Sequence, residues 1–557
     1  MNVNYLKYEI VPTYSDIFDC SPTNNVFISR LKTISCEKAI YILSRFESLF
    51  LAYIQNNIEA KKLYNQLRIK HSHHIQTLGG NITKYCNYKF LMCHQSVFLL
   101  EKWVMCYCPM EHKISEVTIS DLMNIMDLFL LVNERLPKED VAHHETEYLY
   151  LMLFYNSNKI IKNQMARAYY IFTKVARRDK NIVDFLNEYK KRKGFSIEER
   201  IAVLFNSLGS INVANYTIEG MFTNGGVVCA DNFDCKRLSH VYTKVMREIR
   251  KDYSYMCPKI NNILSQEWNF EPFYRFPFLK IDDWQFCFSE TFLVYQMWEG
   301  LYWDVRYTFP NDGEIFMTQF GKPFEAYVQE ITRAAAEAAN NQVVFQNEFF
   351  YYYNRNKIAS TDCYFRIGNT LFAVEVKAKS PSSTTLTGVN RVAIEAEVND
   401  LIIDPIEQAV NRLNEINSCI DSIDKNIMTI FNNLEEVIVL SVTMEKVQPI
   451  GELLFVLDKK LKSKLSNTKI VAYHNVNIEE YENLCNLIET QADKLPNLLT
   501  DWFKCQRKDK RSGVVLANYL IGCNLPYTCS NYVETLFNYT INDIYCKTFC
   551  AENTIDN

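Results

Sequence analysis

Apolar residues recur at three- and four-residue spacing through much of the first half of the chain. This spacing places apolar side chains on one side of an α-helix. A capping box, Ser196 with Glu199 three residues later, predicts a further helix start just after Gly194. The pattern therefore predicts a mostly helical region up to about residue 210 and another helix over 234–253, and it is clearest over residues 39–67, 121–136 and 160–186.

The pattern changes near residue 310. Residues 268–307 are dense in aromatics, and their alternation favours core strands over a platform for stacking nucleic-acid bases. After them, alternating runs predict short strands, and Asp404 with Pro405 and Glu407 predicts a capped helix start. We therefore predict three parts: a mostly helical region of unknown role at 1–310 with 268–307 as a connector, a mixed α/β (α+β) domain at 311–490, and a helical C-terminal extension at 491–557.

The dipeptide Gly368-Asn369 separates two alternating runs and predicts a two-residue β-hairpin turn. The turn sets the register, so Phe365 should face Phe372, and Asp362 should face Glu375 across the ladder. The expected core face carries Cys363, Phe365, Ile367, Phe372, Val374 and Val376. The opposite face, which we expect outside the core, carries Asp362, Tyr364, Arg366, Ala373, Glu375 and Lys377.

Two opposed carboxylates on this hairpin need compensation. At about 5 Å they repel by roughly 3 kcal/mol at an effective dielectric near 20. Lys377, two residues after Glu375 on the same face, is one source of compensation, and a divalent cation between Asp362 and Glu375 is another. A structural ion pair with Lys377 and Arg366 is the alternative to a metal site.

Asp362 together with Glu375-Val376-Lys377 resembles the PD-(D/E)XK nuclease superfamily. The resemblance covers roughly residues 315–480 and departs at Thr361, where that family often has proline. It implies a restriction endonuclease-like αβββαβ core, with an acidic residue, Glu325, in a segment over 324–328 that opens the preceding helix. Strands are expected at 437–443 and 470–473, and a helix at 478–488.

The resemblance also assigns roles to individual residues. Asp362, Glu375 and the backbone carbonyl of Val376 would hold Mg²⁺, with Mn²⁺ as the other ion such sites accept. Lys377 would orient the attacking water or neutralise developing charge. Glu325 would orient the metal shell or bind a second ion, and Gln408, on the helix after the hairpin, would point to the site or remain an exposed helix residue.

The chain has 557 residues and a formal net charge of −5, so it is not basic overall and any nucleic-acid surface must be local. Arg237, His240, Lys244, Arg247 and Lys251 recur at spacings of three and four, which predicts a basic stripe on one helix face. The stripe would either contact phosphates or be the solvated side of an amphipathic helix.

No apolar run approaches the ~18 residues of a membrane-spanning helix, so we expect no membrane segment. The 18 Cys show no paired framework and the start of the chain shows no secretory signal, which favours free thiols and a cytoplasmic location.

These features predict a magnesium-dependent nuclease that hydrolyses phosphodiester bonds, with DNA favoured as substrate. An RNase of the same fold is one alternative. Another is a non-catalytic interaction protein in which the nuclease-like fold is a scaffold and the N-terminal helices bind a partner protein or a second copy.

Overall fold

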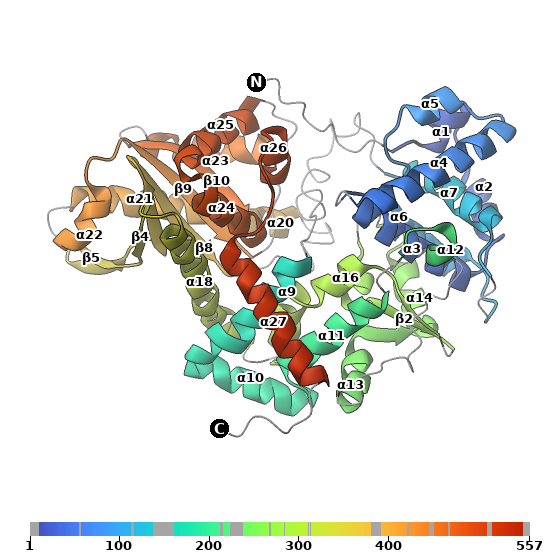
Figure 1. The fold of residues 1–557 in the computed structure, drawn as a ribbon, viewed down its shortest axis with the longest axis horizontal. Helices are drawn as coiled ribbons and strands as arrows, with labels where there is room; N and C mark the ends of the chain where they lie inside the picture. Colours follow the sequence, from blue (N-terminus) through green and yellow to red (C-terminus); the bar gives the residue numbers. More distant parts are fainter. Residues whose placement is uncertain are drawn as a thin grey trace.

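The computed structural model describes residues 11–54, 57–112, 116–136, 161–211, 215–222, 238–266, 269–282, 284–309, 311, 313–379, 391–419, 423–444, 451–465, 468–508 and 515–549. Figure 1 shows a helical group in blue at one end and a lobe built around a β-sheet, yellow to red, at the other. Helices in cyan and green lie between and below them.

The N-terminal end consists of amphipathic helices whose apolar sides meet in one buried cluster, which includes Leu43, Phe46 and Leu131. Later segments, Ile218–Phe222 (α12), Tyr253–Asn262 (α14) and Glu271–Arg275 (α15), add side chains to this cluster. The helices are α1 (Tyr14–Phe18), α2 (Asn24–Leu31), α3 (Cys36–Ile54), α4 (Ile58–Thr77), α5 (Ile82–Cys86), α6 (His94–Tyr107) and α7 (Ile119–Asn133). The predicted helical character of this region is confirmed.

The helix break predicted at Gly194 and Ser196 is confirmed, whereas the helix predicted over 234–253 is shorter, because α13 spans Ser239–Ile249 and a strand follows it. The chain turns at Gly194, whose φ of 74° is left-handed, and there α10 ends. The Ser196 N–H then donates to Glu199 Oε2 (2.6 Å), and the Glu199 N–H donates back to Ser196 Oγ (3.2 Å). The elements are α9 (Ile161–Tyr170) with the π turn η2 (Ile171–Val175) and the 3-10 turn η3 (Ala176–Arg178), α10 (Lys180–Lys193), α11 (Ile197–Ile211) and α13 (Ser239–Ile249).

The aromatic-rich segment is core, as predicted, but only 278–281 and 284–287 form the strands that its alternation favoured. Phe286, Trp298 and Tyr302 are all buried. A small sheet places β2 (Phe278–Ile281) between β1 (Arg250–Asp252), which is parallel to it, and β3 (Trp284–Cys287), which is antiparallel. Two helices follow, α16 (Glu290–Tyr295) and α17 (Glu299–Thr308).

The lobe at the other end is built on a five-stranded mixed sheet of order β10-β9-β8-β7-β4. β4 (Val343–Asn347), β7 (Cys363–Ile367) and β8 (Thr370–Lys377) are antiparallel neighbours, while β9 (Glu436–Thr443) and β10 (Ile470–Asn477) run parallel to β8. The long helix α18 (Gly313–Ala338) precedes the sheet, and α24 (Ile478–Gln491) follows it. The predicted mixed α/β class is confirmed. Residues 324–328 do not open a helix, because they lie within α18 just after Pro323.

The hairpin register is confirmed, because Phe365 pairs with Phe372 and Cys363 pairs with Val374. Gly368 has the positive φ, 58°, that the turn requires. The predicted core face does pack against α18 and α24. The prediction that the other face lies outside the core is wrong, since Tyr364 and Ala373 are buried in a second cluster. Helices cover both faces, as they do in sheets with parallel strands.

One helical segment covers that second face. It comprises α20 (Arg391–Val398), the π turn η5 (Asn399–Ile403) and α21 (Asp404–Ser418), so the predicted capped start at Asp404 is wrong. Pro405 has no N–H to give to the carbonyl of Leu401, four residues earlier. The side chain of Asn475 on β10 donates to that carbonyl instead (Nδ2 to O, 3.2 Å). The proline is therefore tolerated within a continuous helical run.

Smaller elements complete the lobe: the hairpin of β5 (Phe350–Tyr353) and β6 (Asn356–Ala359), α22 (Lys425–Met428) with the 3-10 turn η7 (Thr429–Phe431), α23 (Gly451–Leu465) and the 3-10 turn η8 (Ala492–Lys494). The C-terminal helices are α25 (Leu495–Lys508), α26 (Leu516–Gly522) and α27 (Asn531–Phe549), and α27 lies beside α9 (Figure 1).

The predicted domain limits stay predictions. A helix break does separate α17 from α18, while one buried cluster includes residues on both sides of that break. None of the helices in the described ranges is long and apolar enough to cross a membrane.

Candidate active site

Asp362 lies at the start of the central hairpin, held from two sides. Its Oδ2 accepts the backbone N–H of Val376 on β8 (2.7 Å). Its backbone carbonyl accepts Gln329 Nε2 from α18 (2.8 Å) and the N–H of Glu348 (3.0 Å). The paired ladder ends at Cys363 and Val374, so Asp362 lies just before β7 rather than on it, and the predicted strand pairing with Glu375 is wrong in this detail. The carboxylate nevertheless reaches the end of β8 that carries Glu375.

Glu375, Lys377 and Gln408 are brought together at the carboxyl end of β8. Lys377 Nζ lies 3.4 Å from Glu375 Oε1 and 3.2 Å from Gln408 Oε1. Glu375 is only 3% exposed, whereas Lys377 and Gln408 are half-buried. Gln408 therefore bridges from the helix above the sheet to the strand that carries the predicted site.

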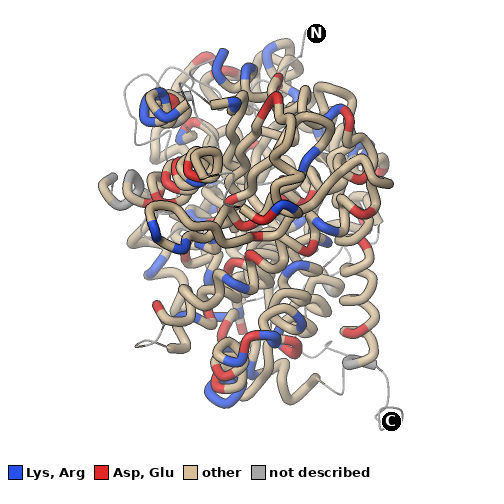
Figure 2. Tube along the Cα trace, turned by 90° about the vertical axis from the view of Figure 1, so that its left-hand side faces the viewer, with Lys and Arg blue, Asp and Glu red and all other residues tan. Residues whose placement is uncertain are grey.

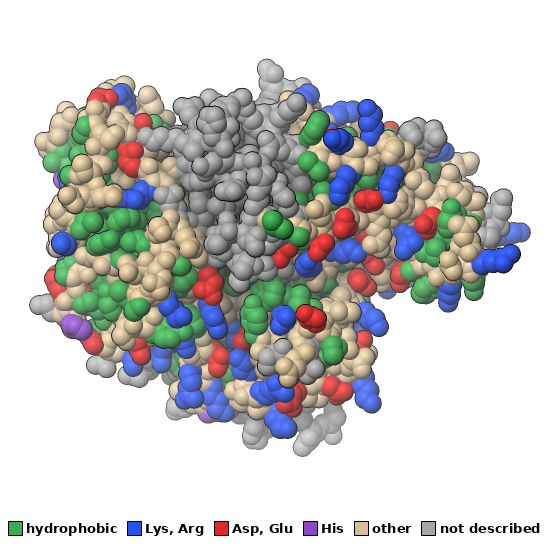
Figure 3. Space-filling view, turned by 180° about the vertical axis from the view of Figure 1, so that it is seen from behind, with side chains coloured by type: hydrophobic (Ala, Val, Ile, Leu, Met, Phe, Trp, Pro, Cys, Tyr) green, Lys and Arg blue, Asp and Glu red, His purple; other side chains and the backbone are tan. Residues whose placement is uncertain are grey.

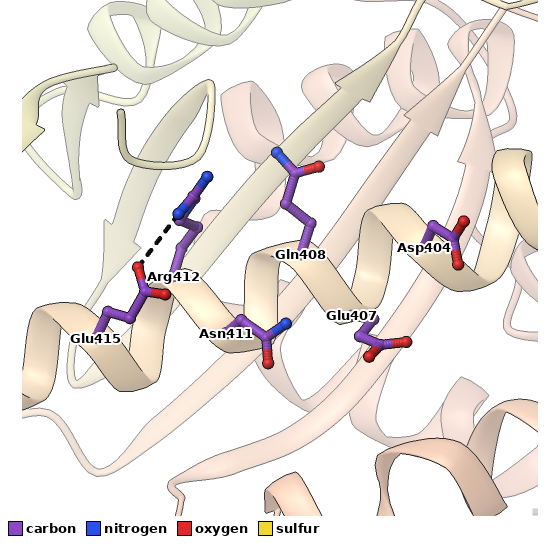
Figure 4. Close-up of a pocket in the computed structure, with 6 residues that line it drawn as sticks. All are labelled: Asp404, Glu407, Gln408, Asn411, Arg412 and Glu415. Atoms are coloured by element: carbon purple, nitrogen blue, oxygen red, sulfur yellow. Dashed lines mark hydrogen bonds and ion pairs between the residues drawn. The ribbon is translucent and has the colours of Figure 1, made fainter. Parts of the chain in front are cut away.

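The surface of α21 beside this group holds a depression lined by Asp404, Glu407, Gln408, Asn411, Arg412 and Glu415. Figure 4 shows Gln408 and Arg412 rising from one side of the helix and Glu407 and Asn411 on the other. Arg412 Nη1 pairs with Glu415 (3.2 Å). The lining is polar and rich in charge, so this depression suits an ionic or highly polar ligand better than an apolar one.

Glu375 also begins a polar row that crosses three parallel strands. It is in register with Ser441 on β9, which is in register with Asn475 on β10. Asn475 Nδ2 lies 3.3 Å from Ser441 Oγ and also holds the carbonyl of Leu401. Sequence reasoning missed Ser441 and Asn475. For Ser441 the signal was available, since it interrupts the apolar run of its strand, whereas Asn475 lies between His474 and Asn477 and does not stand out.

Burial and mutual repulsion raise the pKa values of the acidic groups. Burial, then the charges of Glu375 and Glu325, raises the pKa of Asp362 well above its ordinary value, against the Val376 N–H and Lys377. Burial raises the pKa of Glu375 to about 7, with Lys377 opposing the shift and Glu325 adding to it. Burial and mutual repulsion therefore favour the protonated forms of both carboxyls when no cation is bound.

Glu325 lies on α18 within electrostatic reach of this group. Burial, followed by the charge of Glu348, raises the pKa of Glu325, and Lys377 lowers it. Burial also raises the pKa of Glu348. Gln329 and Glu348 were missed from the sequence. Gln329 could have been found, because it lies four residues after Glu325 on the same helix face.

The donor set is made of oxygens: the carboxylates of Asp362 and Glu375 and the nearby amide oxygen of Gln408. Oxygen donors of this kind suit a hard divalent cation. Within the described part of the chain, no group of three or more His, Cys, Asp and Glu side chains is arranged to hold a metal ion. Any ion here would rest on two carboxylates and complete its shell with water or substrate oxygens, which is how Mg²⁺ is commonly bound.

The predicted basic stripe is only partly formed. Arg237 lies outside the described residues. Lys244 and Arg247 are exposed on α13, where Lys244 Nζ donates to the carbonyl of Gly194 (3.1 Å). The prediction that Lys251 shares the helix face is wrong, because α13 ends at Ile249 and Lys251 lies in β1, its Nζ 5.0 Å above the ring of Phe276. In Figure 2, acidic and basic residues are interspersed over the sheet end of the molecule.

Comparison of the chain with protein-family models, with curated proteins and with solved structures found no match.

Proposed function

We propose that this protein is a metal-dependent nuclease that hydrolyses phosphodiester bonds, with DNA as the favoured substrate. The observation that carries the proposal is the meeting of Asp362, Glu375, Lys377 and Gln408, from three separate chain segments, at the carboxyl end of the central strand β8. A buried pair of carboxyls with raised pKa values beside a lysine costs folding stability, and such arrangements concentrate at functional sites.

The order of elements supports the same proposal at the level of the fold. A helix, three antiparallel strands, a helix and a parallel fourth strand follow one another as α18, β4, β7, β8, α21 and β9. This order is the αβββαβ arrangement that the sequence resemblance implied, with β5 and β6 as an insertion between the first two strands. We therefore propose a restriction endonuclease-like core for this lobe.

The residues present fit Mg²⁺ or Mn²⁺. Two carboxylates that repel each other in a buried site gain from a cation placed between them. Asp362 and Glu375, with the backbone carbonyl of Val376, would hold the ion. When bound, the ion would polarise the scissile phosphate and lower the pKa of a water molecule.

The remaining side chains have separate tasks. The ammonium group of Lys377 lies beside Glu375 and Gln408. From there it can neutralise charge that develops on the phosphate or orient the attacking water. Gln408 accepts a hydrogen bond from Lys377 and so fixes the direction of the ammonium group. Gln329 and the Glu348 N–H hold the backbone of Asp362 and so keep its carboxylate at the end of β8.

The test is incubation of the purified protein with plasmid DNA and with RNA, each with Mg²⁺, with Mn²⁺ and with EDTA. We expect cleavage that needs the divalent ion and is lost in Asp362→Asn. The matched control is Asp501→Asn, an exposed carboxylate on α25, which should cut like the wild type. Cleavage of RNA alone would assign an RNase, and a wild type that cuts neither polymer would overturn the proposal.

A further inference from the structure

A separate two-stranded hairpin projects between β4 and β7. Its strands β5 and β6 pair antiparallel, with Tyr352 opposite Lys357 and Phe350 opposite Ala359. Asn354 and Arg355 form the turn, both with positive φ (49° and 65°), as a tight twisted hairpin requires. The hairpin forms its own sheet and is not part of the five-stranded one.

The two faces of this hairpin differ sharply. On the inner face Tyr351 is 2% exposed, packs in the cluster around α21, and donates its hydroxyl to Glu415. On the outer face Phe350 is 59% and Tyr352 is 64% exposed. Lys357 Nζ lies 4.4 Å from the centre of the Phe350 ring. The hairpin is therefore anchored by one face and presents two aromatic rings to solvent on the other.

The base of the hairpin adjoins the candidate active site. Ser360 N–H donates to the Phe349 carbonyl (2.8 Å), and the Glu348 N–H donates to the carbonyl of Asp362 (3.0 Å). The anchor Glu415 lies seven residues after Gln408 on α21, which corresponds to roughly 10 Å along a helix. A chain of nucleotides that reaches Asp362 would therefore pass within reach of the exposed rings.

The charged side chains of the hairpin itself are both basic. From residue 349 to 361 the sequence has Arg355 and Lys357 and no acidic residue. Both side chains are exposed. In Figure 3, hydrophobic and basic side chains lie next to one another at the end of the molecule that β5, β6 and α22 form. Exposed aromatic rings with two basic side chains on the same hairpin match the bases and phosphates of a single strand.

We infer that the outer face of the β5–β6 hairpin binds unpaired nucleotides of the nucleic-acid substrate. Phe350 and Tyr352 stack on bases, while Lys357 and Arg355 contact phosphates. Side chains two residues apart on a strand are about 7 Å apart, twice the ~3.4 Å spacing of stacked bases, so each ring can take its own base. The inference rests on the proposed function and narrows its substrate to nucleic acid with a single-stranded segment beside the scissile phosphate.

Binding is measured by fluorescence anisotropy in an Asp362→Asn background, so that the oligonucleotide stays intact. Single-stranded and duplex oligonucleotides of equal length are compared at several salt concentrations. We expect Phe350→Ala and Tyr352→Ala each to weaken single-strand binding by roughly 5- to 150-fold, with duplex binding almost unchanged. The slope of log affinity against log salt concentration counts the counterions that are released on binding. For single strands, Lys357→Ala should reduce that number by about one.

The control is Tyr307→Ala, which removes an aromatic ring that is also 59% exposed but lies on α17, and it should bind like the background protein. A Phe350→Ala/Tyr352→Ala double variant that binds single strands as well as the background protein would overturn the inference. If the same double variant only changes the oligomeric state in size-exclusion chromatography, the face is a contact between copies and the inference is also wrong.

A cleavage assay separates this inference from the proposed function. Its substrate is a duplex with a single-stranded tail, and the proteins compared all retain Asp362. A wild type that cuts, with a double variant that cuts the tailed duplex equally well, would refute the hairpin role alone. A wild type that cuts no nucleic acid while the ring variants still lose single-strand binding would refute the nuclease and leave the hairpin as a binding surface.

Discussion

Glu375→Gln tests the electrostatics of the site, because it removes one buried charge and keeps the size of the side chain. The pKa of Glu375 is raised from 4.5 to about 7 in the folded protein. A carboxyl whose folded pKa exceeds its unfolded pKa stabilises the fold fully below the unfolded value, and that contribution is lost as the pH rises through the folded value. The unfolding free energy of the metal-free wild type should therefore fall by about 3 kcal/mol between roughly pH 4.5 and pH 8 because of this one group.

The variant should not show this loss. In EDTA, the difference in unfolding free energy between Glu375→Gln and the wild type should grow by about 2.5 kcal/mol from pH 5 to pH 8. For a cooperative unit of 150–250 residues this corresponds to a relative rise in Tm of roughly 5–10 °C. Thermal melting followed by circular dichroism over this pH range measures it.

Mg²⁺ provides the second arm of the same experiment. The ion competes with the protons on Asp362 and Glu375, so its stabilisation of the wild type should increase with pH and be absent in the variant. Glu337→Gln, at an exposed position on α18, is the control and should follow the wild type. Identical pH profiles for wild type and Glu375→Gln in EDTA would refute the idea that burial raises this pKa.

Three further predictions concern single side chains. Asp362→Asn should abolish Mg²⁺-dependent cleavage yet melt at the same or a higher temperature in EDTA; earlier melting with and without Mg²⁺ would instead indicate a structural ion pair. Lys377→Ala should also abolish cleavage, but Mg²⁺ affinity measured by calorimetry should persist or tighten, because a nearby positive charge is gone. Gln408→Ala should lower the cleavage rate by roughly 10- to 100-fold, as loss of an orienting partner does at metal sites, and Gln408→Glu should restore part of it by again accepting from Lys377. An unchanged rate in Gln408→Ala would leave Gln408 as a surface residue.

Local sequence signals predicted the hairpin and its register well, because a two-residue turn fixes which residues pair. Gly368 with Asn369 sets the pairing of Phe365 with Phe372, and the core face follows from alternation. The helix ends at Gly194 and Ser196 were equally local. Asp362, Glu375 and Lys377 could be identified as candidate site residues because their spacing, in that register, places them close together on the hairpin.

Features that depend on distant segments could not be predicted in the same way. The burial of Tyr364 depends on a helix that begins almost thirty residues later, so alternation alone assigned its face wrongly. Asp404 looked like a helix cap because Pro405 follows it, yet tertiary packing carries the helix through this point. Lys251 kept a helical spacing in a segment where pairing with β2 takes the backbone into a strand.

The hydrogen bond from Asn475 to the Leu401 carbonyl has a consequence for when the proposed site is completed during synthesis. Asn475 lies 100 residues after Glu375, so the strand that fixes the proline-containing turn under α21 leaves the ribosome long after the carboxylates do. Until β10 docks beside β9, nothing on that strand holds the start of the helix that carries Gln408. A nascent chain that ends before residue 470 should therefore hold both acids in an incomplete site, and we expect nuclease activity to emerge only once most of the chain has been made.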